Sequence, residues 1–253
     1  MPGGFIAVIP ARYGSTRLPG KPLAEINGKT MIQRVYEQTI GSEAAEVMVA
    51  TDDERIMRAC AGFGARAELT RGDHRSGTDR IAELAERFAW PDAQIVVNVQ
   101  GDEPGLPPAL VTQVAAVLET NREAGMATLA APLTCDAQWR DPNVAKVVTD
   151  REGRALYFSR ASIPFPQHGE QPPASRHVGI YAYRVRTLKT LAKTPPCELE
   201  LIEGLEQLRA LWLGIQIVVA QACEAPSRHV ETREDLEAVR RELAALRGTQ
   251  NSV

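Results

Sequence analysis

The sequence is poor in the features that mark several common classes of protein. It has four cysteines in 253 residues and no CxxC pair, so neither a zinc site nor a disulfide framework is indicated. Its apolar runs are far shorter than a membrane span, and the opening MPGGFIAVIPAR has no apolar signal-peptide core. We therefore expect a cytoplasmic protein with no membrane partner.

Positive charge is not in excess either. The formal net charge is -3 and the sequence pI is about 5.9, which in practice excludes a nucleic-acid binder that works through a basic stripe. A serine-nucleophile elbow, an HExxH motif and catalytic-triad spacing are all missing. These absences point away from the common hydrolases.

The first half contains a regular alternation of strand-like and helix-like segments. Alternation of this kind is typical of a mostly parallel, doubly wound α/β sheet with right-handed crossovers. The apolar runs and their spacing predict strands over 5–10, 46–52, 65–69 and 94–104, and helices over 30–40, 53–64, 76–89 and 107–120.

The second half changes character, because its strands follow one another closely. The pattern predicts strands over 126–133, 144–150, 154–160, 176–184 and 215–221, and helices over 185–194, 198–212 and 232–247. DREG forms a hairpin turn between the second and third of these strands, and the Pro-rich segment 164–176 is expected to be a mobile loop. We predict a single α/β domain over 1–253 that contains an inserted antiparallel lobe at about 126–184.

The segment ARYGSTRLPGK directly follows the first strand and carries positive charge without any acid. Arg12, Arg17 and Lys21 match phosphate oxygens, and glycines let the backbone approach an anion closely. The segment is neither a GxxxxGK[ST] loop nor a GxGxxG fingerprint. A solvated basic loop is the alternative, but three cations between a strand and a helix favour a phosphate site.

Two further polar segments fall where ligands bind in such a sheet, beyond the carboxyl ends of strands. VNVQGDEP ends a buried strand in Asp102, which suits Mg²⁺ or, alternatively, a helix cap. TRGDHRSGTDR contains Arg71 and Ser76 and suits a nucleobase or phosphate reader, or simply a capping loop. Together the three segments indicate phosphoryl or nucleotidyl transfer.

Long motifs then connect the chain to a known family. They are IPARYGSTRLPGKPL, VATDDERI, TRGDHRSGTDRIAE, VVNVQGDEP, ALYFSRASIPF, RHVGIYAYR and LEQLRALW. They stand in the same order, over nearly the whole chain, as in the 3-deoxy-manno-octulosonate (Kdo) cytidylyltransferases, which the sequence resembles. This resemblance implies a Rossmann-like α/β nucleotidyltransferase core. It also implies a Mg²⁺-dependent reaction of CTP with Kdo that releases pyrophosphate and gives CMP-Kdo for lipopolysaccharide synthesis.

The resemblance also implies roles for particular residues. Arg12, Arg17 and Lys21 would hold the CTP triphosphate, Arg71 and Ser76 would read cytosine and ribose, and Asp102 would ligate magnesium. Of these, Arg12, Lys21 and Asp102 form the expected catalytic set. The sugar acid would contact Gln100, Arg160, His177, Tyr181, Glu206 and Gln207.

Within the sugar set, Arg160 is suited to the carboxylate because its guanidinium is a forked donor, whereas Tyr181, Glu206 and Gln207 are suited to hydroxyls. A solvated helix face is the alternative for Glu206. The family is expected to form a homodimer, with the antiparallel lobe at the subunit contact.

One position departs from the family pattern. A second metal-binding aspartate is usual in a Val-Asp-Thr run before the last helix, and this chain has HVET, with Glu231 at that position. Octahedral Mg²⁺ tolerates the extra methylene poorly unless the backbone or a water adapts. We predict Glu231 as the second metal ligand, and Asp235 on the following helix is the alternative.

The sequence is also consistent with two other functions. Cytidylyl transfer to a related sugar acid, such as a sialic acid or an amino-substituted Kdo, would use much the same nucleotide site. A nucleotide-binding regulatory protein without catalysis is the second alternative, and the aspartate-to-glutamate change is the feature that favours it.

Overall fold

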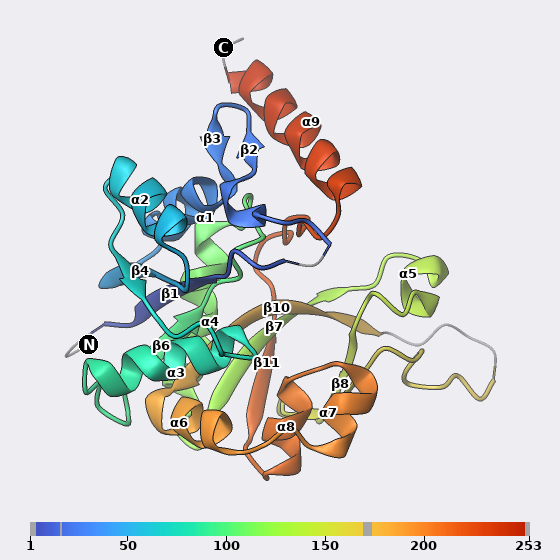
Figure 1. Ribbon diagram of the computed structural model, residues 1–253. Coiled ribbons are helices and arrows are strands. Elements are labelled where there is room, and N and C mark those ends of the chain that lie inside the picture. Colours follow the sequence, from blue (N-terminus) through green and yellow to red (C-terminus); the bar gives the residue numbers. More distant parts are fainter. Residues whose placement is uncertain (1–3, 16, 169–173, 251–253) are drawn as a thin grey trace.

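The computed structural model describes residues 4–15, 17–168 and 174–250 (Figure 1). Over these residues the main sheet has nine strands, and seven of them form a continuous path in the order β11-β7-β10-β6-β1-β4-β5. Its strands are β1 (Ile6–Ala11), β4 (Glu46–Thr51), β5 (Ala67–Leu69), β6 (Ile95–Asn98), β7 (Met126–Pro132), β8 (Lys146–Thr149), β9 (Ala155–Ser159), β10 (Ser175–Arg184) and β11 (Ile217–Gln221). A separate small hairpin consists of β2 (Glu25–Ile26) and β3 (Lys29–Thr30).

The pairing directions agree with the predicted α/β class. The four strands β6, β1, β4 and β5 are parallel to one another, and β11 is parallel to β7. Strand β10 runs antiparallel between β6 and β7. The prediction of a mostly parallel, Rossmann-like sheet flanked by helices is confirmed.

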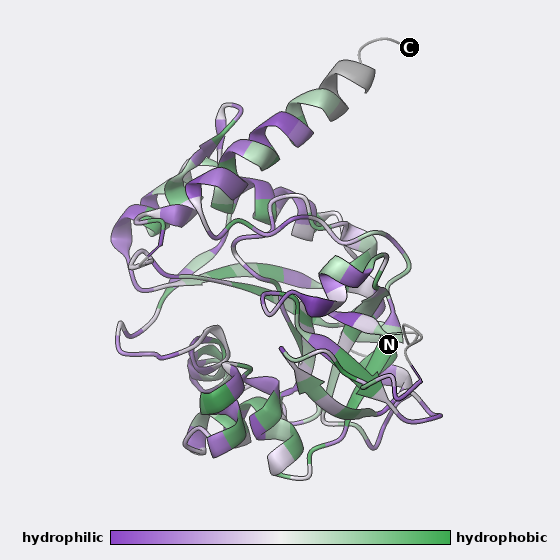
Figure 2. Cartoon of the chain, turned by 90° about the vertical axis from the view of Figure 1, so that its right-hand side faces the viewer, coloured by the Kyte–Doolittle hydropathy of each residue, from purple (hydrophilic) through white to green (hydrophobic). Residues whose placement is uncertain are grey.

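Alternation along β1 explains why helices cover both faces of the sheet. Ala7 and Ile9 are buried against one helical layer, whereas Ile6 and Val8 are buried against the other. The first layer contains α1 (Met31–Ile40), α2 (Glu54–Gly62) and α4 (Pro108–Thr120), and the second contains α3 (Gly77–Arg87), α6 (Val185–Lys193) and α8 (Gln207–Trp212). Figure 2 shows the resulting distribution, with hydrophobic colour concentrated on the central strands and both colours on the helices.

Residues 126–184 contribute both to the main sheet and to an extension of it. Strands β7 and β10 lie in the centre of the sheet, whereas β8 and β9 form an antiparallel hairpin that pairs with the first residues of β10. Asp150–Gly153 closes this hairpin, with Gly153 in the left-handed region at φ 78°. A role for this extension in dimer formation stays a prediction.

Several expected elements differ in detail. The single helix predicted over 198–212 is wrong, because Gly204 at φ 63° separates α7 (Glu198–Glu203) from α8. The sequence patterns also missed β2, β3, α5 (Asp136–Arg140) and the 3-10 turn η1 (Lys21–Leu23), all of which are too short to show a period. The expected loop at 164–176 lies partly outside the described residues.

The C-terminal helix α9 (Arg233–Gln250) positions the segment that precedes it. Leu236 and Val239 pack on Ile26 of the β2–β3 hairpin, and Val230 is buried in the same cluster. The Val230 N–H donates to the Asp102 carbonyl at 2.9 Å, so this contact carries residues 226–231 to the end of β6. None of the helices that the structure describes is long and apolar enough to cross a membrane.

Three strand and helix ends meet closely beside Pro10, the penultimate residue of β1. A Cβ added to Gly101 would lie 2.7 Å from the Pro10 carbonyl oxygen, and one added to Gly77 would lie 2.9 Å from the Pro10 ring. Glycine at these two positions therefore lets the loop after β6 and the start of α3 touch the end of β1.

Gly101→Ala is expected to lower the free energy of unfolding by about 1–3 kcal/mol, because backbone atoms must move to admit the methyl group. Gly62→Ala is the matched control, since nothing lies within 4 Å of an added Cβ there. Urea denaturation of both variants measures the effect. An equal stability of the two variants would contradict the close approach.

Candidate functional site

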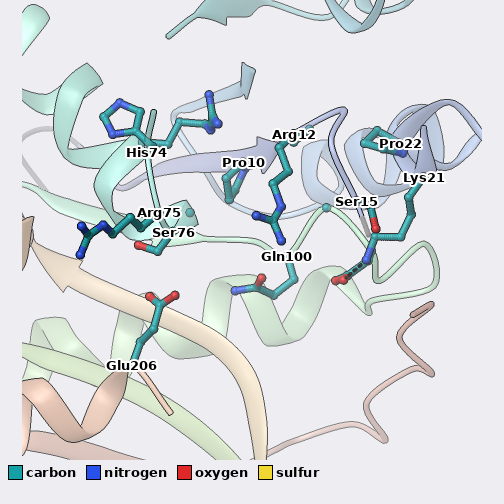
Figure 3. Close-up of a pocket in the computed structure, with 15 residues that line it drawn as sticks. Pro10, Arg12, Ser15, Lys21, Pro22, His74, Arg75, Ser76, Gln100 and Glu206 are labelled. Carbon is teal, nitrogen blue, oxygen red and sulfur yellow. Dashed lines mark hydrogen bonds and ion pairs between the residues drawn. The ribbon is translucent and has the colours of Figure 1, made fainter. Parts of the chain in front are cut away.

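The ends of β1 and β6 and the start of α3 enclose a cavity of about 240 Å³ (Figure 3). Figure 3 shows Arg12 and Gln100 pointing into it from one side and Glu206 from the opposite side. Its lining includes six residues of the predicted site: Arg12, Lys21, Ser76, Gln100, Asp102 and Glu206. The cavity lies where ligands are expected in an open α/β sheet.

An ion pair joins the basic segment to the end of β6. The Lys21 ammonium donates to Asp102 Oδ2 at 2.6 Å and to the Val230 carbonyl at 3.1 Å. Both side chains are mostly buried, so the geometry is well defined and the pair is screened little by solvent. The sequence placed the two residues in one site but did not reveal that they contact each other.

Arg17 has an acidic partner, whereas Arg12 has none among the described residues. Arg17 Nη1 lies 2.5 Å from Glu231 Oε2, so the residue predicted to bind metal also pairs with a residue predicted to bind phosphate. Arg12 is exposed to the cavity and has no acidic partner among the described residues. Its charge is therefore available to an anionic ligand.

The segment 70–76 is organised by a half-buried carboxylate on α3. Glu83 accepts from the Arg71 N–H at 3.0 Å and lies 2.5 Å from His74 Nε2. Ser76 caps α3, because its hydroxyl accepts from the Asp79 N–H at 3.2 Å, and it also lines the cavity. The Arg71 side chain is 70% exposed and lines a neighbouring depression, so the structure does not bring its guanidinium into this cavity.

A second ion pair lies at the cavity and joins two residues that were not predicted as site residues. The buried Arg80 donates to Asp52 Oδ2 at 2.9 Å and to the Arg71 carbonyl at 3.2 Å. Asp52 also accepts from the Tyr13 N–H at 3.3 Å. Both residues lie inside quoted motifs, VATDDERI and TRGDHRSGTDR, but only the fold reveals that they meet.

A second cavity, of about 370 Å³, adjoins the first and shares Gly77, Gln100, Asp102 and Glu206 with it. Its lining includes His177, Tyr181, Gln207 and Glu231 from the predicted site. In the described part of the chain, four buried side-chain atoms lack a hydrogen-bond partner, and all of them belong to residues that line this cavity: Asn98 Oδ1, Glu103 Oε2, Gln207 Nε2 and Ser227 Oγ. Buried polar atoms are normally paired, so the cavity is built for a polar ligand.

An irregularity in β10 shapes the wall of this cavity. The register with β7 shifts between Val178 and Tyr181, and the Thr128 hydroxyl fills the gap by bonding to the carbonyls of Val178 at 3.1 Å and Ile180 at 2.7 Å. Thr128 Oγ1 also lies 2.9 Å from His177 Nε2.

Because the threonine proton goes to a carbonyl, His177 must donate through Nε2, which leaves Nδ1 as an acceptor. Burial lowers the pKa of His177 to about 3, so the ring is neutral at neutral pH. The Tyr181 ring lies 5.2 Å from the His177 ring, and burial holds the pKa of the Tyr181 hydroxyl well above its usual value. Both rings therefore act as neutral hydrogen-bonding groups.

Glu206 and Gln207 sit where α8 begins. Glu206 is exposed and lines both cavities, and Thr78 Oγ1 donates to it at 3.2 Å, while the partial loss of water around the carboxylate raises its pKa. Gln207 is 3% exposed and its amide nitrogen has no partner among the described residues. The exposure of Glu206 agrees with the alternative of a solvated helix face, although the side chain also faces the cavities.

Arg160 is the predicted sugar-binding residue that the structure does not bring into the cavity. Its guanidinium donates to the Glu203 carbonyl at 2.7 Å and to the Pro142 carbonyl at 2.9 Å. Arg176, which the sequence reading did not single out, lines the cavity instead. Its place in RHVGIYAYR, directly before His177, was the available signal.

Asp102 and Glu231 are the two carboxylates of the predicted metal site. Both carboxylates line the second cavity, and the Val230–Asp102 backbone bond holds their segments together. Oxygen ligands of this kind, completed by phosphate oxygens, fit Mg²⁺. No group of three or more His, Cys, Asp or Glu side chains that could hold a metal occurs in the described residues, so a metal here would also need oxygen atoms from outside the chain.

Asp235, the alternative metal ligand, is already engaged. Its Oδ2 accepts from the Thr232 N–H at 2.9 Å, the Thr232 hydroxyl at 2.9 Å and the Glu231 N–H at 3.1 Å. Burial alone would raise the pKa of Asp235, but these hydrogen bonds outweigh it and leave the pKa below its usual value. Thr232 therefore caps α9 and Asp235 completes the capping box, because the Thr232 hydroxyl accepts from the Asp235 N–H at 3.2 Å. Glu231 is the carboxylate that faces the cavity.

Comparison with known proteins identifies the family of the chain. A profile of the cytidylyltransferase family matches residues 6–217. Curated 3-deoxy-manno-octulosonate cytidylyltransferases of Pseudomonas fluorescens and Pseudomonas syringae pv. tomato are 56% and 54% identical, over 97% of this chain and 100% of theirs. A solved structure of CMP:2-keto-3-deoxy-manno-octonic acid synthetase complexed with CTP aligns with a TM-score of 0.90 and 42% identity, covering 96% of this chain and 99% of that one. The resemblance seen in the sequence is confirmed, and the chain belongs to the 3-deoxy-manno-octulosonate cytidylyltransferase family of nucleotidyltransferase enzymes.

Proposed function

We propose that the chain transfers CMP from CTP to Kdo, releases pyrophosphate and so supplies CMP-Kdo for lipopolysaccharide synthesis in the cytoplasm. The observation that carries this proposal is the junction of two unlike cavities at Gln100 and Asp102. The first cavity presents the cations of Arg12 and Lys21. The second presents the neutral rings of His177 and Tyr181, unpartnered polar atoms, and the charges of Arg176 and Glu231. A nucleoside triphosphate and a sugar acid fit them, with the reacting atoms at the junction.

The basic segment suits the triphosphate. Arg12 faces the first cavity without an acidic partner in the described chain, and Lys21 is fixed there by Asp102. As the bond from the α-phosphorus to its leaving oxygen breaks, Arg12, Arg17 and Lys21 would offset the charge that develops on pyrophosphate. Ser76 lines the same cavity, where a base and ribose would lie beside the start of α3.

The acceptor end suits the sugar. In the proposed reaction the anomeric hydroxyl oxygen of Kdo forms a bond to the α-phosphorus, pyrophosphate leaves, and the hydroxyl proton passes to solvent. Asp102 and Glu231 would hold Mg²⁺, which neutralises phosphate charge and lowers the pKa of a hydroxyl bound to it. Gln100, His177, Tyr181 and Gln207 would orient the sugar through neutral hydrogen bonds.

A homodimer is also part of the proposal. Leu156 on β9 is 62% exposed, and Leu201 and Ile202 on α7 are 71% and 72% exposed. Glu203 of α7 bonds to Ser159 of β9 at 2.6 Å, so the two elements lie together. Exposed large apolar side chains on adjoining elements are typical of a protein contact.

Pyrophosphate release with CTP, Mg²⁺ and a panel of sugar acids tests the function. We expect turnover with Kdo, and a loss of at least about a hundredfold in Asp102→Asn with the fold retained, because the metal contributes several kcal/mol to such reactions. Turnover with a different sugar acid alone would contradict the substrate. CTP binding without any turnover would favour the regulatory alternative.

Glu231 has two roles to separate, because it also pairs with Arg17. If it ligates metal, Glu231→Gln should raise the Mg²⁺ concentration needed for half-maximal activity, and Glu231→Asp should not. The increase should persist in an Arg17→Gln background, where the ion pair is already absent. A normal Mg²⁺ requirement in that double variant would mean that Glu231 only positions Arg17.

The dimer contact is tested at Ile202. Ile202→Glu should shift the protein toward monomer in sedimentation velocity, because a charge cannot be buried there without a partner. Ile40→Glu is the control, since Ile40 is also exposed, at 52%, but lies on α1. An unchanged dimer in the first variant, or monomers in both, would contradict this contact.

A further inference from the structure

Glu103 is a carboxylate that the proposed mechanism leaves unused. It follows Asp102 at the end of β6, and only 7% of the residue is exposed. Neither of its carboxylate oxygens has a hydrogen-bond partner in the part of the chain that the structure describes, and Oε2 is fully buried. An unpaired buried carboxylate costs stability, so its presence here needs another explanation.

The surroundings of Glu103 place it in the wall of the second cavity. A Cβ added to Gly179, inside the irregular part of β10, would lie 3.7 Å from Glu103 Oε1, so the carboxylate lies against this part of the strand. Ser227, whose hydroxyl is also unpartnered, approaches the same segment, with its Cβ 3.3 Å from a Cβ added to Gly105. Arg176 lines the cavity but does not pair with Glu103. The Glu103 carboxyl group can pair with a hydroxyl in either of its protonation states, because a hydroxyl both donates and accepts hydrogen bonds.

The chemistry of the unpartnered atoms indicates the ligand. They comprise a carboxylate oxygen, an amide oxygen, an amide nitrogen and a hydroxyl, on Glu103, Asn98, Gln207 and Ser227. This mixture of donors and acceptors complements a polyol rather than a phosphate or a lone cation. We propose that Glu103, assisted by Ser227, binds a hydroxyl of the acceptor sugar and contributes to the selection of that sugar. This inference rests on the proposed function.

The test compares Glu103→Met, Glu103→Gln and Ser227→Ala with the wild-type protein. Glu103→Met keeps the length of the side chain and removes its hydrogen bonds. We expect its KM for Kdo to rise about tenfold or more, the loss expected for a hydrogen bond to a buried polar group, with the KM for CTP unchanged. Glu103→Gln can still accept and donate, so it should recover much of the loss. Ser227→Ala should weaken Kdo binding in the same direction.

Thermal melting supplies a readout that does not depend on turnover. Without ligand, Glu103→Met should melt at the same temperature as the wild type or higher, because an unpaired buried carboxylate has been removed. The stabilisation by Kdo should fall, and the stabilisation by CTP should not. Glu224→Met, at an exposed glutamate after β11, is the control and should behave as the wild type in every measurement.

Each other outcome contradicts the inference. An unchanged KM for Kdo in Glu103→Met would show that the carboxylate does not touch the sugar. A lower melting temperature together with weaker CTP binding would mean a structural role, and a selective rise in the Mg²⁺ requirement would mean a metal ligand. If the wild-type protein neither turns over nor binds Kdo, the proposed function fails instead, which distinguishes the two.

Discussion

The site depends on the close packing of Gly77 and Gly101 against Pro10. Without a Cβ at the two glycines, the end of β1, the start of α3 and the loop after β6 approach more closely than side chains allow. That approach places Gln100 and Asp102 beside the basic segment and next to the α3 cap at Ser76. The ion pair of Lys21 with Asp102 is a consequence of this packing, since the two residues are far apart in the sequence.

The two cavities that meet there follow different electrostatic rules. On the proposed nucleotide side, Lys21, Arg17 and Arg80 each form an ion pair with a carboxylate. A triphosphate could replace the carboxylates beside these basic side chains, and a cation could replace the basic side chains beside the carboxylates. On the acceptor side, burial keeps His177 and Tyr181 uncharged, and these rings stand beside charged groups such as Arg176 and Glu231. A preformed arrangement of this kind needs little reorganisation when substrates bind.

Much of the fold followed from periodicity, because the strands and helices of the first half are long enough to show it. The failures came where tertiary context decides, as at Gly204, which splits one predicted helix into α7 and α8. In the site, charge and motif order indicated which residues matter, and the resemblance assigned their roles. They could not show that Arg160 bonds to backbone carbonyls, or that Glu103 has no partner, because both depend on what surrounds a side chain.

The position of Glu231 depends on the docking of the C-terminal helix α9. This carboxylate reaches the cavity only because α9 docks on the hairpin of β2 and β3 and the Val230 N–H bonds to the Asp102 carbonyl. The contacts that complete the site therefore join the last quarter of the chain to its first and middle parts. Docking of α9 is therefore what holds Glu231 beside Asp102, and loosening of this one helix would move the carboxylate away from the cavity while the sheet stays intact.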